Sequence, residues 1–202
     1  MDEQTHLKLK EIKQSFRLQM NGIASHSMRQ KGMDYKLNWG VSLPQLREMA
    51  TQYGKDYALA VELWKENIRE CKILATLIMP PSKMPLEVAN IWMEQTYTQE
   101  MAEMAAFNLY QYMDDAPVLA YRWIASDNTI ARLTGYQVLA CLFRKGNEPD
   151  IRGLNELIDQ ARATLSEDHL SLKHAVMNCM NRLCELGTEY EQLVHLSLPD
   201  FI

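Results

Sequence analysis

The sequence predicts an all-α protein built as a solenoid of stacked helix pairs. Apolar residues recur at helical spacing along nearly the whole chain, and no segment shows the alternation of a strand. Caps or helix breakers separate the apolar segments. Similar small-and-apolar runs return about every 30 residues. With 202 residues, 47% of them hydrophobic, the chain can bury a sizeable core.

Local signals place the ends of most expected helices. Ser42 is a plausible N-cap with Pro44 in the first turn, and Gly54 ends that helix. Later in the chain, Asp127 is expected to cap the helix that follows it. The expected helices, in order, span 3–30, 43–53, 57–66, 68–79, 85–95, 99–113, 116–125, 128–144, 151–164, 170–186 and 188–196.

The second helices of successive pairs carry related runs, at 73–77, 104–109 and 133–139. Amphipathic helix pairs with short connections stack side by side, because a lone pair cannot bury its apolar face. This pattern favours an α-solenoid of HEAT-like helix pairs, an α-α superhelix, over an irregular helical bundle. We expect a single HEAT-like repeat domain over 1–202, which comprises an N-terminal basic helix and loop (1–36), helix-pair repeats (37–186) and a C-terminal cap (187–202).

Composition narrows the function classes. With 21 Lys and Arg against 26 Asp and Glu, the net charge of −5 disfavours a general binder of nucleic acid or anionic membranes. No apolar run approaches the roughly 18 residues of a membrane span, and the polar N-terminus does not resemble a signal peptide, so we expect a cytoplasmic protein. The four cysteines form no C-x-x-C pair and the histidines are scattered, so we expect buried thiols and neither metal nor cofactor.

The charge is unevenly distributed. Residues 1–36 contain seven Lys or Arg and four Asp or Glu, a local charge of +3. Between Lys83 and Arg122 there is no basic residue, while the same stretch contains six acidic ones. A phosphate backbone that crossed this middle repeat would therefore meet repulsion.

Three segments resemble a known family: 40–50, which reads GVSLPQLREMA, the pair Leu63-Trp64, and 122–128, which reads RWIASDN. They are similar to the AlkD-like DNA alkylation repair proteins, HEAT-like repeat glycosylases that remove positively charged alkylated bases. The resemblance implies a carboxylate in the middle repeat that stabilises positive charge on the deoxyribose. It also implies tryptophans against the lesion nucleotide and an arginine on the next repeat that holds a phosphate. Such a carboxylate works only if it is fixed and shielded from water.

The catalytic residues of that family are not retained in this sequence. Its W-x-x-x-D pattern falls on Met101 and Ala105 in the preferred register. Moving the register to Glu103 brings Gln99 to the tryptophan position, and moving it to Glu100 does not bring a tryptophan either. Glu103 and Glu100 are therefore only weak catalytic candidates.

Two functional positions further along the chain also differ from the family's residues. The family's arginine falls on Leu133, one residue from Arg132, and its second tryptophan falls on Asn178. Trp123 and Asp127 do match W-x-x-x-D, but they straddle a helix boundary, where packing and capping explain them.

The remaining functional signal is a set of cations on the second helices, which usually line the concave face of a HEAT-like solenoid. These could contact double-stranded DNA, with Lys10, Lys13 and Arg17 of the basic N-terminal helix adding to them. Alternatively they are solvated charges in local pairs, such as Arg69 with Glu66 and Glu70. The candidate DNA-binding residues are Arg69, Lys72, Arg132, Lys173 and Arg182.

We expect a catalytically degenerate AlkD-like protein that acts as a binding scaffold, with DNA as its partner. Two alternatives stay open. One is an active DNA glycosylase, an enzyme of DNA alkylation repair in which Glu103 or Glu100 replaces the aspartate. The other is a protein-binding adaptor that uses the acidic middle repeat and binds a protein partner in place of DNA.

Overall fold

The computed structural model describes residues 2–33 and 35–199. Within these ranges every regular element is helical, apart from one isolated bridge between Leu37 and Ile68. The all-α prediction is therefore confirmed. The chain forms two compact units, one up to Leu109 and one from Tyr110 onward. The division into a basic N-terminal segment, repeats and a cap stays a prediction.

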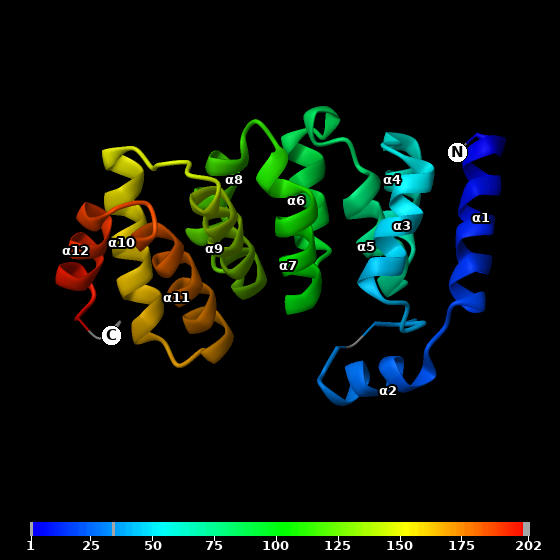
Figure 1. The fold of residues 1–202 in the computed structure, drawn as a ribbon, viewed down its shortest axis with the longest axis horizontal. Helices are drawn as coiled ribbons and strands as arrows, with labels where there is room; N and C mark the ends of the chain where they lie inside the picture. The colour runs from blue at the N-terminus through cyan, green and yellow to red at the C-terminus, as the bar shows by residue number, and fades with distance from the viewer. Residues whose placement is uncertain (1, 34, 200–202) are drawn as a thin grey trace. The chain divides into compact units, whose positions relative to one another are not determined.

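In the first unit, α5 is the central helix. It packs against α3, α4 and α7, and α1 packs against α4, as Figure 1 shows. Because α5 has neighbours on several sides, nearly all of its side chains are buried, including charged ones. The helices of this unit are α1 (Glu3–Leu18), α2 (Gly22–Gln30), α3 (Leu43–Tyr53), α4 (Tyr57–Lys65), α5 (Arg69–Ile78), the short 3-10 helix η1 (Pro81–Lys83), α6 (Leu86–Glu94) and α7 (Gln99–Asn108).

The single helix expected over 3–30 is wrong, because the chain turns a corner between α1 and α2. Asn21 makes this corner: its side-chain oxygen accepts from the Ala24 N–H at 3.0 Å and caps α2. Its own N–H donates to the Trp39 carbonyl at 2.9 Å. In Figure 1, α2 consequently lies crosswise to α1.

In the second unit, α9 is the central helix, packed between α8 and α11. Gly135 allows the close approach of α8, since a Cβ at this position would lie 2.6 Å from the Ala120 carbonyl oxygen. The helices of this unit are the short 3-10 helix η2 (Tyr110–Tyr112), α8 (Ala116–Ile124), α9 (Thr129–Arg144), α10 (Ile151–Ser166), α11 (Leu170–Cys184) and α12 (Thr188–Ser197).

Two further expectations need correction. The helix expected over 99–113 stops at Asn108, because Leu109 leaves the helical conformation and η2 follows. Asn128, and not Asp127, caps α9, with its side-chain oxygen 2.9 Å from the Ile130 nitrogen and 3.0 Å from the Ala131 nitrogen. The other expected helices are confirmed, with small shifts at their ends. None of the helices in the described ranges is long and apolar enough to cross a membrane.

Candidate nucleic-acid interface

The α7 helix carries the positions at which the resemblance implies catalysis. Met101 and Ala105, the residues of the preferred register, are both fully buried and bear no charge. The more open side of α7 carries Gln99 and Glu103 instead, and the Gln99 amide donates to the Glu103 carboxylate at 2.8 Å. Glu103 borders a wide hollow of about 730 Å³ that also contains Lys31 and Gln99. This carboxylate is therefore partly exposed to water.

Glu100, the other weak catalytic candidate, is held by two partners. The Arg69 guanidinium binds it with two nitrogens, Nε at 2.9 Å from Oε2 and Nη2 at 2.5 Å from Oε1. The Tyr35 hydroxyl donates to Oε2 at 3.0 Å. Burial and the nearby Glu100 carboxylate raise the pKa of Tyr35, so its hydroxyl stays protonated. Glu100 is therefore committed to a structural ion pair.

Glu70 completes this buried cluster from the opposite side of Arg69. Its carboxylate accepts from the backbone N–H groups of Trp39, Gly40 and Val41, at 2.9 Å for Gly40. The Arg69 Nη1 lies 3.4 Å from Glu70 and donates to the Val41 carbonyl at 3.1 Å. Burial lowers the pKa of Arg69, but the two carboxylates outweigh it and raise that pKa overall. Arg69 thus connects the 39–41 loop to α5 and α7, and it presents no free charge to a phosphate.

Lys72, the second predicted DNA contact, is also buried. Its Nζ lies 3.2 Å from the Trp64 carbonyl oxygen and 4.2 Å from the centroid of the Trp64 ring. That ring stacks on Trp92 with 4.2 Å between centroids. Burial lowers the pKa of Lys72 to about 8. The side chain is therefore part of the core of the first unit and does not reach a ligand in solvent.

Two of the three predicted DNA contacts in the second unit are already paired with carboxylates. The Arg132 guanidinium binds both oxygens of Glu167, at 2.7 and 2.9 Å, and the hydrogen bond to this carboxylate raises the pKa of Arg132. Arg182 pairs with Glu185 at 2.7 Å. Lys173 is different, because it is half-exposed and has no partner among the described residues.

The other two positions that the resemblance singled out in this unit carry no charge. Leu133 is buried, and the Asn178 amide donates to Gln137 at 3.2 Å. Leu133 therefore has no group that could bind a phosphate, and Asn178 has no aromatic ring that could stack on a nucleotide.

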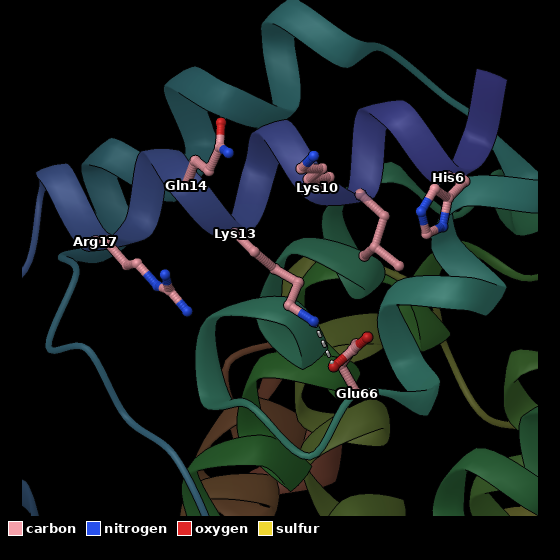
Figure 2. A pocket seen from close by; sticks show the side chains of 7 residues that line it. His6, Lys10, Lys13, Gln14, Arg17 and Glu66 are labelled. Atoms are coloured by element: carbon pink, nitrogen blue, oxygen red, sulfur yellow. Dashed lines mark ion pairs between the residues drawn. The ribbon is translucent and has the colours of Figure 1, made fainter. Parts of the chain in front are cut away.

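One side of α1 gathers cations that are not all neutralised. Lys10, Lys13 and Arg17, which we name the α1 basic face, follow one another at helical spacing and line a hollow of about 410 Å³ (Figure 2). Lys13 pairs with Glu66 at 3.1 Å, and Lys10 is exposed without a partner in the described part of the chain. Arg17 is exposed, with its guanidinium carbon 5.7 Å from the centre of the Trp39 ring.

The hollow beside the α1 basic face is therefore lined by three cations and by one carboxylate, that of Glu66. The local charge of +3 in residues 1–36 was the signal for this surface in the sequence. The geometry suits the backbone of a nucleic acid, which is bound mainly through Lys and Arg.

Comparisons with known proteins agree with this fold. The model of the DNA alkylation repair enzyme family matches residues 12–194. A solved structure aligns with a TM-score of 0.85 at 16% identity, over 96% of this chain and 83% of that chain. Its protein is described as one of a new family related to the HEAT-like repeat DNA glycosylases, with affinity for branched DNA structures. The predicted HEAT-like fold is confirmed by this likeness. A comparison with curated proteins gives no match.

Proposed function

This chain belongs to the DNA alkylation repair enzyme family, and from that premise we propose that it is a DNA-binding scaffold that excises no bases. We propose that it binds branched DNA through the α1 basic face. One observation carries the proposal: α7, which would hold the catalytic carboxylate, has none among its residues that is both free and shielded from water.

Catalysis by α7 is disfavoured on electrostatic grounds. A carboxylate stabilises a developing positive charge effectively only where it is fixed and water is excluded. Glu100 is fixed, but its charge is already compensated by Arg69. Glu103 forms no ion pair within the described residues, but it borders an open hollow and accepts a hydrogen bond from Gln99. The buried Met101 contributes no charge at all.

DNA binding is supported by the α1 basic face and by the relative in the solved structure, which has affinity for branched DNA. Lys10 and Arg17 are both exposed, so a phosphate can approach them without breaking an ion pair. In the second unit, Lys173 is retained as a candidate contact, because it is half-exposed and unpaired within the described ranges.

Charge reversal of the α1 basic face tests the binding. For the double variant Lys10→Glu/Arg17→Glu we expect at least a tenfold weaker affinity for a DNA four-way junction, measured by fluorescence anisotropy at low salt. The slope of log K against log[salt] should become shallower by about 0.9 for each phosphate that the variant no longer binds. Lys83→Glu/Arg152→Glu, at an exposed lysine of η1 and an exposed arginine of α10, changes the net charge by the same amount. It is the matched control and should change the affinity little. Equally weak binding by both variants would contradict a specific role for α1.

An active glycosylase is the second candidate function, favoured by the position of Glu103 on the open side of α7. We expect no release of N7-methylguanine from alkylated duplex DNA above the uncatalysed rate, even at high protein concentration. Release that the Glu103→Gln substitution abolishes would establish the enzyme and refute the scaffold. If the protein binds no DNA at low salt, a protein-binding adaptor becomes the remaining function.

A further inference from the structure

The corner between α1 and α2 exposes three large apolar side chains. Leu18 is 88% exposed, Met20 63% and Ile23 87%. Leu18 is the last residue of α1, and Ile23 lies in the first turn of α2. Scattered exposed apolar residues are normal, but three within six positions of one corner mark a contact surface.

The backbone that carries these side chains is held in place by contacts with residues 38–40. Besides the bond from Asn21 to Trp39, the Ser25 hydroxyl donates to the Asn38 carbonyl at 2.8 Å. Gly40 lies directly under the corner in the left-handed region, with φ +72°, and a Cβ there would lie 2.2 Å from the Asn21 carbonyl oxygen. The corner is therefore a fixed projection of the first unit.

The cations beside the corner indicate the chemistry of a partner that this surface would fit. Arg17 precedes Leu18 directly, and Lys13 and Lys10 follow along the same helix toward its N-terminus. An apolar tip next to a row of cations matches the chemistry of DNA, whose base faces are apolar and whose backbone is anionic. Proteins that bend or unstack DNA insert such apolar wedges between base steps.

We infer that Leu18, Met20 and Ile23 form a wedge that stacks on the base pair left open at the branch point of a DNA junction. The wedge rests on the proposed function. An intact duplex covers its base faces by stacking, whereas a branch point interrupts the stack and leaves a face for the wedge. The α1 basic face then binds phosphates of the adjoining arm, so the two surfaces together favour a junction over a duplex.

The test is the double variant Leu18→Ser/Ile23→Ser, which changes exposed side chains and should leave the thermal unfolding midpoint unchanged. We expect roughly tenfold weaker binding to a four-way junction, because the variant removes apolar side chains whose burial against a base pair would contribute at least this much. Affinity for a duplex of equal length should stay within about twofold, because phosphate contacts dominate it and the variant leaves the cations in place. A 2-aminopurine placed at the branch point should change its fluorescence on binding of the unmodified protein and not of the variant.

Ile151→Ser/Leu196→Ser is the matched control, because these two residues are 81% and 83% exposed on α10 and α12. It should retain the full preference for the junction. If the wedge variant keeps that preference, or if its affinities for junction and duplex fall by the same factor, the wedge is refuted while DNA binding stands. If the unmodified protein binds neither DNA, the proposed function fails and the wedge with it.

Discussion

Replacing Arg69 with methionine is expected to lower the free energy of unfolding by about 3–5 kcal/mol, because it leaves buried carboxylates without their cation. The Glu70 side chain is fully buried and that of Glu100 is 15% exposed. Glu70 keeps its three backbone N–H donors and Glu100 keeps Tyr35, but no described cation replaces the guanidinium. Urea denaturation at neutral pH measures the decrease.

Two variants separate this effect from a general weakening of the packing. Arg69→Met/Glu100→Gln removes the carboxylate that Arg69 compensates, so it should be less destabilising than the sum of the two single changes. Lys65→Met breaks the exposed ion pair with Glu62, whose atoms lie 2.6 Å apart, and should cost less than about 1 kcal/mol. A destabilisation by Arg69→Met as small as that by Lys65→Met would refute the structural role of the cluster.

The fold could be predicted because its signals are local. Helical spacing and caps act over a few residues, as at Ser42, whose N–H donates to the Gln45 side chain at 3.1 Å and starts α3 as expected. The α1–α2 corner was missed for the opposite reason. The corner is held by a hydrogen bond from the Asn21 N–H to the carbonyl of Trp39, which lies beyond α2 in the chain.

The candidate contacts on α5 could not be judged from sequence, because periodicity does not show how many sides of a helix are covered. The alternative interpretation of the sequence paired Arg69 locally with Glu66 and Glu70, and the contact with Glu70 is present at 3.4 Å. Glu66 in fact binds Lys13, and the main partner of Arg69 is Glu100, on another helix. In the second unit, Arg132 likewise finds Glu167 across a long stretch of chain. Charge along the chain was the better guide, because it pointed to the cations of α1.

Replacing Lys72 with methionine is expected to stabilise the protein at pH 7, by up to about 3 kcal/mol. Burial lowers the pKa of Lys72 from 10.5 to about 8 in the folded state. Between these two values the unfolded chain binds more protons than the folded one, so the stability of the unmodified protein rises with pH across this window. Below pH 8 the full cost of the buried charge is present, and it disappears as the pH approaches 10.5.

The buried charge of Lys72 should therefore make the difference in free energy of unfolding between Lys72→Met and the unmodified protein depend on pH. Urea denaturation of the unmodified protein and of Lys72→Met should show the largest gap at about pH 7 and almost none above about pH 10. The same groups titrate in both proteins apart from Lys72, so the gap isolates this one side chain. Lys83→Met, at an exposed lysine, should show no gap at either pH. A constant difference between Lys72→Met and the unmodified protein would mean that packing against Trp64, and not the buried charge, determines the effect.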